Sequence, residues 1–333
     1  MTLRELTGRV PLTLANGRLN PSAVGWARQP LVDTAGLGRG RGRNKRWEYW
    51  NVITPTHILA LTVSAIDYAC VNEVWVLDRA TRQTWGGGET TILRQVSSLP
   101  PSLGEGPARA RTKTLEISVE DVAAGTRLRA AHLRDAVSFD VVAELPVGHE
   151  RLAVVVPWSE TRFQYTVKDV ARPAHGTLTI EGRTVEVPAG QSWAVLDHGR
   201  GRWPYDISWN WGAGSGVSGD RVIGLQLGGQ WTVGTGSTEN AFSVDGRLRY
   251  LPDELTWEYD APEELGPWHV HGGGLDATLV PFYDKRGSTD FGVLTSRGDQ
   301  CFGLWSGSFT PPDGERIDFD GIVGWAEAIH NRW

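Results

Sequence analysis

Residues 192–212, SWAVLDHGRGRWPYDISWNWG, combine an acid with several aromatic side chains at the spacing expected of β-strands. Side chains alternate between the two faces of a strand, so Trp193 and Asp197 would share one face. Trp209 and Trp211 would share a face of the strand that follows. If the face that carries Asp197 points inward, its carboxyl group lies in a cavity with aromatic walls.

A carboxyl group in such a cavity is suited to general acid catalysis. Burial disfavours the charged form of a carboxyl, and the raised pKa that results allows proton donation near neutral pH. Asp197 is therefore our candidate proton donor. The alternative is a structural ion pair at the rim of a barrel, between Asp197 and either Arg200 or Arg202. The sequence favours neither interpretation over the other.

His269 and His271, in WHVHGGG, would also point to one face of a strand. Imidazole nitrogens at this spacing can bind a metal ion, but a site needs a third histidine or a carboxylate from another strand. The sequence designates no such residue, so we expect no metal. We also expect no cofactor, because the Gly-rich segments 212–216, 234–240 and 272–278 do not lie between a strand and a helix, as phosphate-binding loops do.

The overall charge and the remaining motifs restrict the class of partner and the compartment. Residues 39–46, RGRGRNKR, could form a phosphate-binding patch or a solvated loop, and the net charge of −6 disfavours nucleic acid. No apolar run reaches the roughly 18 residues of a membrane helix. The start, MTLRELTGRV, lacks the apolar core of a secretory signal, and two cysteines are too few for a disulfide scaffold. We therefore expect a cytoplasmic protein without a transmembrane segment.

The elements that must position these residues are strands. The chain of 333 residues contains 41 glycines and 16 tryptophans, a composition typical of turns and strands. Apolar and polar residues alternate along much of it, and residues 177–187 and 242–250 have the pattern of hairpins that turn at Glu181-Gly182 and Asp245-Gly246. Because no amphipathic helix exceeds three turns, we predict an all-β fold built from antiparallel barrels or sandwiches.

The chain resembles, almost from end to end, the bacterial family described as domain of unknown function 2804. Many motifs in the same order carry this resemblance, which makes it specific. They are ELTGRVPL, GRLNPSAVGWARQPL, GRNKRWEYW, FQYTVK, LDHGRGRWPYDISWNWG, GLQLGG, GTGSTENAF, VDGRL, PWHV, LVPFYDKR and GWAEAIHNRW.

A second, weaker resemblance is to two-domain lipocalin-like proteins, which include AttH-like proteins, carotenoid 1,2-hydratases and fungal Diels–Alderases. It depends on GTLTIEGRTVEV followed by AVLDHGRG, a W-x-W strand and VDGRL. The resemblance implies two calycin-type barrels packed together, with a ligand pocket at or between them. It also implies that Asp197 is the proton donor of a hydratase-type site. The first barrel would span residues 1–235, with an N-terminal extension, and the second residues 236–333.

These arguments lead to two expected functions. The first is a cofactor-free hydratase, isomerase or cyclase that binds a bulky apolar small molecule and uses Asp197 as the general acid. The second is a non-catalytic carrier of a lipophilic ligand, which needs only an apolar cavity. In both, side chains from three parts of the chain are expected to shape the cavity or to orient polar groups of the ligand. These are Trp193, His198, Trp209, Trp211, Glu239 and Asn240.

Overall fold

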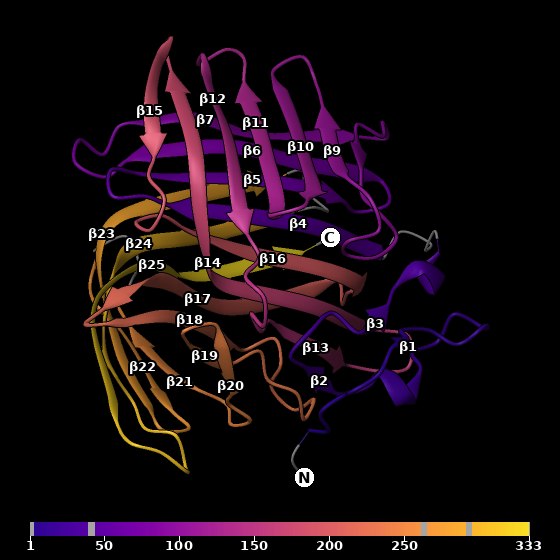
Figure 1. Cartoon of the computed structure of the whole chain (residues 1–333). Coiled ribbons are helices and arrows are strands. Elements are labelled where there is room, and N and C mark those ends of the chain that lie inside the picture. The colour runs from indigo at the N-terminus through magenta and orange to yellow at the C-terminus, as the bar shows by residue number, and fades with distance from the viewer. Residues whose placement is uncertain (1–2, 39–43, 261–264, 291–294, 333) are drawn as a thin grey trace.

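The computed structural model describes residues 3–38, 44–260, 265–290 and 295–332. Almost all of the regular structure is β-strand, in two large antiparallel sheets that each curl into a half-barrel (Figure 1). Among the residues that the structure describes, the helical segments are two short 3-10 turns, Pro21–Ala23 and Ala35–Leu37. Within the described residues, no helix has the length and apolarity needed to cross a membrane. The predicted all-β fold is confirmed.

The first sheet contains fourteen strands, eleven of which form its main path. In spatial order these are β7 (Thr84–Ile92), β6 (Ala69–Asp78), β5 (His57–Ala65), β4 (Asn44–Ile53), β16 (Trp193–Arg202), β14 (Phe163–Ile180), β12 (Val137–Glu144), β11 (Gly125–His132), β10 (Leu115–Val122), β9 (Ala108–Arg111) and β8 (Ser97–Ser98). Three further strands lie off this path. Strands β13 (Leu152–Pro157) and β15 (Arg183–Val187) both pair with β14, and β2 (Trp26–Ala27) pairs with β13.

The long strand β14 lets the first sheet curl. Its pairing with β16 shifts register between Asp169 and Arg172, and Ala171 in the shifted segment has a positive φ of 57°. Such a bulge bends a strand and increases its twist. As a result the two halves of the sheet face each other and enclose an apolar core. Leu61 and Val74 from one half and Leu128 and Phe139 from the other belong to this core.

The second sheet contains nine strands from the C-terminal part of the chain. In spatial order these are β20 (Arg247–Tyr250), β19 (Ala241–Val244), β18 (Arg221–Gly229), β17 (Asp206–Ser218), β25 (Ile317–Arg332), β24 (Thr295–Phe309), β23 (Leu275–Asp290), β22 (Trp268–Gly272) and β21 (Thr256–Tyr259). Its concave face encloses a separate core, to which Phe242, Trp268, Trp305 and Phe309 contribute.

The chain passes from the first sheet to the second between Arg202 and Asp206. Strands β17 and β18, which the expected first barrel of residues 1–235 would have contained, hydrogen-bond within the second sheet. The reason is that β17, the aromatic strand, pairs with β25 near the C-terminus. Local sequence carries no signal for a pairing over so many residues.

Both predicted hairpins are present. Glu181 and Gly182 have φ angles of 50° and 81° and connect β14 to β15. Asp245 and Gly246 have φ angles of 50° and 75° and connect β19 to β20. Positive φ at both central positions is what a two-residue hairpin turn of this hand requires.

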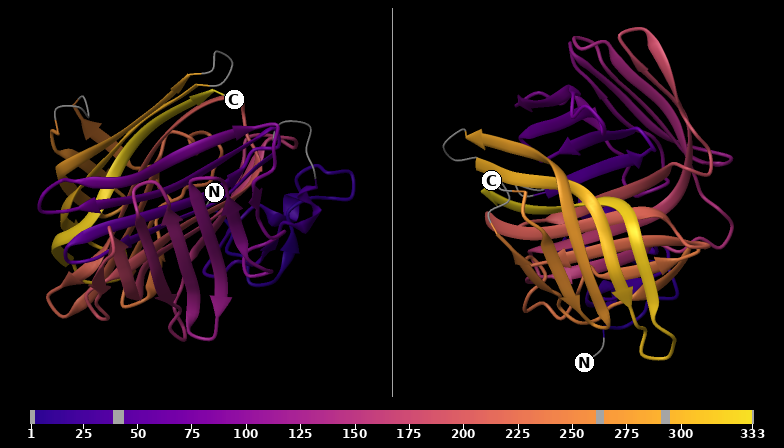
Figure 2. Two further views of the ribbon diagram at one scale, coloured as in Figure 1. Left: turned by 90° about the horizontal axis from the view of Figure 1, so that it is seen from above. Right: turned by 90° about the vertical axis from the view of Figure 1, so that its left-hand side faces the viewer.

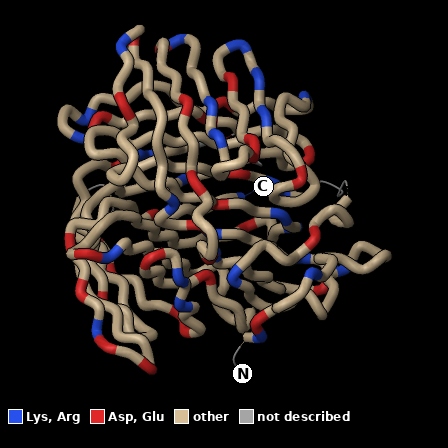
Figure 3. Tube along the Cα trace, viewed as in Figure 1, with Lys and Arg blue, Asp and Glu red and all other residues tan. Residues whose placement is uncertain are grey.

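The N-terminal segment packs against one end of the first sheet. Its short strands β1 (Val10–Pro11) and β3 (Val32–Asp33) pair in parallel, and β2 extends the sheet beside β13. Leu12 and Leu37 from this segment are buried against Val155 and Tyr165. Of the basic stretch 39–46, residues 39–43 lie outside the described residues, and Asn44–Arg46 begin β4. Elsewhere basic and acidic residues are interspersed over both sheets (Figure 3).

The two half-barrels pack against each other through their outer faces (Figure 2). Successive side chains of β5 alternate between the two faces of its sheet, and each face packs against a different apolar cluster. Leu59 and Leu61 point into the first core, whereas Ile58 and Ala60 belong to an apolar cluster between the sheets. That cluster also contains Trp75 and Phe302, which stack with ring centroids 5.4 Å apart, and Trp325. We call this contact region the seam.

Candidate functional site

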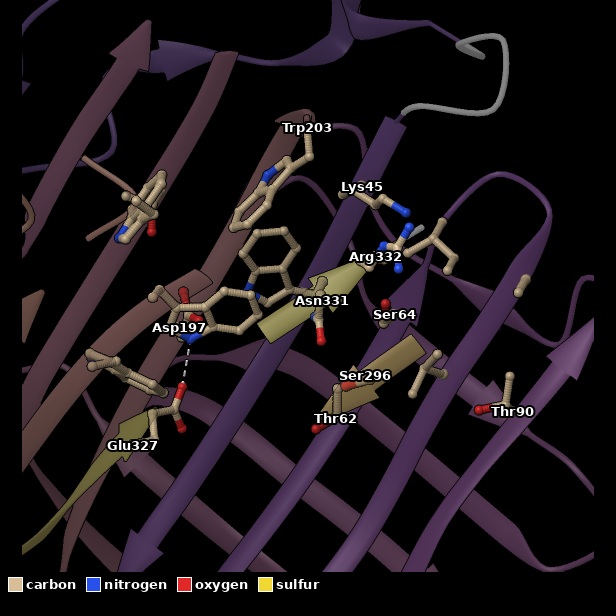
Figure 4. A pocket seen from close by; sticks show the side chains of 18 of the residues that line it. Lys45, Thr62, Ser64, Thr90, Asp197, Trp203, Ser296, Glu327, Asn331 and Arg332 are labelled. Atoms are coloured by element: carbon tan, nitrogen blue, oxygen red, sulfur yellow. Dashed lines mark hydrogen bonds between the residues drawn. The ribbon is translucent and has the colours of Figure 1, made fainter. Parts of the chain in front are cut away.

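A cavity of about 320 Å³ lies in the seam, beside the apolar cluster. Its volume falls in the range of roughly 300–1,000 Å³ that is typical of small-molecule sites. Strands β4, β5, β6, β7, β14 and β16 of the first sheet and β17, β24 and β25 of the second contribute side chains to it (Figure 4). On β5, Thr62 and Ser64 continue the outward face of Ile58 and Ala60 into the cavity.

Tryptophan side chains form one wall of this cavity. The rings of Trp203 and Trp231 stack with centroids 5.5 Å apart and planes 10° from parallel. Trp47 and Trp209 meet Trp203 edge-on, with centroid distances of 5.4 Å and 5.8 Å. Such mutual packing fixes the orientation of each ring, so the wall presents a rigid apolar surface. Trp211 lines the cavity as well.

A buried cluster of charged side chains lies beside this wall. Lys168 on β14 and Asp197 on β16 are directly opposite each other in the strand pairing, and Lys168 Nζ lies 3.0 Å from Asp197 Oδ1. The same ammonium group is 3.6 Å from Glu239 Oε2 and 3.9 Å from the centroid of the Trp211 ring. Burial opposes the charge of Lys168, but the two carboxylates outweigh it and raise the pKa of Lys168.

Glu327 on β25 is a third carboxyl group of the cavity. It faces Trp211 on β17 and Gln300 on β24 in the strand pairings. Trp209 Nε1 donates a hydrogen bond of 2.9 Å to Glu327 Oε1, and Gln300 Nε2 donates one of 3.1 Å to Oε2. Figure 4 shows the carboxyl groups of Glu327 and Asp197 on the same side of the cavity. The two sheets therefore each supply an acid to one site.

Burial raises the pKa of two of these carboxyl groups, those of Glu327 and Glu239. It raises the pKa of Glu327 to about 7, although the hydrogen bond from Trp209 and the charge of Lys168 oppose this shift. Burial also raises the pKa of Glu239, again against the attraction of Lys168. Near neutral pH both groups can exchange a proton, which is what general acid–base chemistry requires.

The structure brings four of the seven predicted site residues together. Asp197, Trp209, Trp211 and Glu239 all line the cavity. The alternation predicted for residues 193–198 also holds, because Val195 lies in the seam, whereas Ala194 and Leu196 lie in the first core.

The other three predicted residues lie outside this cavity. Trp193 is buried at the start of β16. His198 is buried on the opposite face of β16, with Nδ1 3.7 Å from Glu48 Oε1, and burial lowers its pKa to about 4. The side chain of Asn240 links two backbone segments. Its Oδ1 accepts a hydrogen bond of 2.6 Å from Gly228 N, and its Nδ2 donates one to Asp253 O.

The predicted ion-pair alternative for Asp197 needs a correction. Its cationic partner is Lys168, not Arg200 or Arg202. The reason is the period of the strand, since positions 200 and 202 carry their side chains on the face opposite to position 197. Arg200 pairs with Glu48 at 3.3 Å. Arg202 donates to backbone oxygens and to a side chain of the N-terminal part of the chain.

Sequence reasoning missed several residues of the site, among them Trp47, Lys168, Trp203, Trp231 and Glu327. Lys168 and Glu327 do occur within FQYTVK and GWAEAIHNRW, two of the motifs that carry the family resemblance. A charged residue inside an otherwise apolar strand was therefore the available signal. Its meaning depends on pairing partners from distant parts of the chain, which the motifs themselves do not show.

A second hollow of about 380 Å³ adjoins the cavity and extends the site along the seam. Asp197, Trp209, Trp211 and Glu327 line both spaces. The extension is more polar, and Tyr49, Glu73, Lys285 and Gln300 are among the residues that line it.

Comparison with solved structures shows the same lipocalin-like fold in three proteins. Kievitone hydratase from Nectria haematococca matches with a TM-score of 0.50 and 12% identity, over 88% of this chain and 89% of that one. CghA matches with a TM-score of 0.52 and 11% identity, over 87% and 88%. A putative AttH from Nitrosomonas europaea matches with a TM-score of 0.52 and 13% identity, over 86% and 92%.

At these identities the structures show a shared fold and no more. No curated protein matches the sequence. The family described as domain of unknown function, DUF2804, matches residues 3–333. This match spans both half-barrels and all the residues of the cavity, and it agrees with the resemblance found in the sequence motifs. The chain therefore belongs to the DUF2804 family.

Proposed function

We propose that this protein binds a bulky apolar small molecule in the seam cavity and catalyses a cofactor-free proton transfer on it, of the hydratase, isomerase or cyclase type. The observation that carries the proposal is Glu327, a buried carboxyl with a pKa of about 7 beside a wall of tryptophans. An apolar ligand would be held by the aromatic surface, and its reacting atom would lie near an acid that can donate a proton at neutral pH.

The roles within the cluster follow from the contacts. Glu327 gives a proton to the ligand and, as a carboxylate, recovers one from water or from another position on the ligand. Asp197, the donor expected from sequence, is paired with Lys168 at 3.0 Å and so serves as the counter-charge that holds this ammonium group in place. Lys168 in turn stabilises negative charge that develops on an oxygen of the ligand. Glu239 can exchange a proton within the same cluster.

The test begins with native mass spectrometry of protein from its own host, to identify a co-purifying ligand. That ligand is then incubated with the protein in deuterated water, because an enzyme that moves protons exchanges carbon-bound hydrogen or converts the ligand. Glu327→Gln should slow exchange or turnover by about 10²–10⁴-fold, since it keeps the volume and removes the transferable proton. Glu254→Gln is the matched control, because burial also raises the pKa of Glu254 but its side chain lies outside the cavity.

The other variants separate the remaining interpretations. If Asp197→Asn abolishes exchange while Glu327→Gln retains it, Asp197 is the acid, as the sequence alone predicted. If the ligand is released unchanged and undeuterated by every form of the protein, the protein is a carrier of a lipophilic molecule. The aromatic wall suits a carrier equally well, so this outcome would keep the binding half of the proposal and overturn the catalytic half.

A further inference from the structure

Three adjacent strands of the second sheet present two histidines and two carboxylates on one face, away from the seam cavity. Glu258 on β21 lies opposite His269 on β22, and His271 on β22 lies opposite Asp276 on β23. Because His269 and His271 are two residues apart on one strand, their side chains emerge on the same side, and their rings stack with centroids 4.8 Å apart. The sequence designated no third ligand for this pair, whereas the strand pairing supplies Glu258.

The donor atoms of these residues converge. Glu258 Oε2 lies 3.2 Å from His269 Nδ1, and Glu258 Oε1 lies 3.8 Å from His271 Nε2. One ligand atom from each of the three residues can be chosen so that all lie within 4.8 Å of one another. Ligands of a tetrahedral zinc ion, with bonds of roughly 2.0–2.1 Å, are separated by about 3.3 Å. The spacing therefore suits a metal ion after small rotations of exposed side chains.

Asp276 adds a second, independent feature of metal sites. Its Oδ1 lies 3.0 Å from His269 Nε2, on the side of the ring away from Glu258. A histidine ligand commonly donates one ring N–H to a carboxylate, which leaves the lone pair of the other nitrogen for the metal. Here that arrangement leaves Nδ1 of His269 facing Glu258.

We propose that Glu258, His269 and His271 form a surface site for a divalent transition metal ion of the zinc type, oriented by Asp276. Two imidazole nitrogens and a carboxylate oxygen are a ligand set that Zn²⁺ accepts, with water completing the tetrahedron. The histidines are more than one-third exposed, at 37% and 38%, so an ion can reach them directly from solvent.

The experiment is isothermal titration of the full chain with ZnCl₂ at pH 7.5, after chelator treatment and dialysis. We expect one ion per chain, and weaker binding at pH 5.5, because protons compete for the histidine nitrogens. His271→Ala and Glu258→Gln should each reduce affinity at least about tenfold, and Asp276→Asn by about 10–100-fold. Co²⁺ bound at this site should show the visible absorption of a tetrahedral complex.

His175→Ala is the matched control, since His175 is an exposed histidine whose Nδ1 pairs with Glu144 at 2.9 Å outside the cluster. It should bind Zn²⁺ as the parent protein does. Far-ultraviolet circular dichroism of each variant establishes that the sheet is intact, which is expected for exposed side chains. The proposal is overturned if the parent protein binds no Zn²⁺ at millimolar concentration, or if His271→Ala and Glu258→Gln bind it as tightly as the parent.

Discussion

Glu327 shows how much of a residue's chemistry depends on what surrounds it. A carboxyl whose pKa is raised in the folded state binds a proton more tightly there than in the unfolded chain. Its contribution to stability is therefore fully present below the ordinary pKa of 4.5 and is lost as pH rises through about 7. A protonated Glu327 is the form that the folded cavity prefers.

From this we predict the pH dependence of a single variant. Between pH 5 and pH 8 the melting temperature of the parent protein should fall relative to that of Glu327→Gln, because the amide cannot ionise. Thermal melts of both proteins in matched buffers measure the difference. A constant difference between the two curves across this range would mean that Glu327 has an ordinary pKa.

The two acids Asp197 and Glu327 show how much of the site could be predicted from the sequence. The position of Asp197 in an alternating strand placed it on the aromatic face, and the structure agrees. Its partner Lys168 could not be inferred, because the two residues meet only through the pairing of β14 with β16. Glu327 reaches the site through β17 and β24 in the same way. Local pattern predicts which face a residue occupies, but not which residue it meets.

At the scale of elements, a glycine in strand β16 leaves the space that a tryptophan of the aromatic wall occupies. Gly199 lies opposite Trp47 in the pairing of β16 with β4, and a Cβ at position 199 would lie 2.1 Å from the Trp47 ring. Trp47 therefore lies flat against the strand, in the space that a side chain would otherwise fill. This close approach allows the ring to reach Trp203.

We predict that Gly199→Ala displaces Trp47 and damages the wall. Overpacking of this kind costs about 1–3 kcal/mol of unfolding free energy. Quenching of tryptophan fluorescence by an apolar probe should also weaken. Urea denaturation and a probe titration measure the two effects. Gly87→Ala on β7 is the control, because a Cβ there meets nothing within 4 Å. Equal behaviour of the two variants would show that Trp47 can move without cost.

Elements with a clear alternation or a two-residue turn were predictable, and others were not. The hairpins at Glu181-Gly182 and Asp245-Gly246 could be predicted because their turn residues tolerate positive φ. Strand β7, TWGGGETTI, has three consecutive glycines and exposed neighbours, so its sequence lacks the apolar alternation of a half-buried strand. It is a strand because β6 offers it a partner.

At the scale of the whole molecule, the two half-barrels are joined by an aromatic seam. Phe302 on β24 is fully buried and contacts Trp75 of the first sheet and Trp325 of the second. Beside it, Lys285 Nζ of the second sheet lies 2.7 Å from Glu73 Oε2 of the first. Because this packing is apolar and buried, we expect each sheet to depend on the other for stability.

We predict that Phe302→Ala lowers the unfolding free energy by about 3–5 kcal/mol, since it leaves a cavity in the seam. If the sheets unfold together, near-ultraviolet circular dichroism and intrinsic fluorescence should report one coincident transition for the parent protein. Arg286→Ala, at the half-exposed rim of the seam, should change stability far less. A loss as small as that of the rim variant would show that the sheets are stable without this contact.

Two separate cores with a cavity between them also have an evolutionary consequence. Substitutions on the outer faces of β5, β17 or β25 alter the walls of the cavity while the residues that fill each core remain the same. Positions that line the cavity but lie outside the seam cluster, such as Thr62 and Ser64 on β5, can therefore change with little effect on either core. Kievitone hydratase, CghA and a putative AttH from Nitrosomonas europaea share the fold at 11–13% identity. Such a scaffold carries the lining of its cavity and the packing of its cores on opposite faces of the same strands.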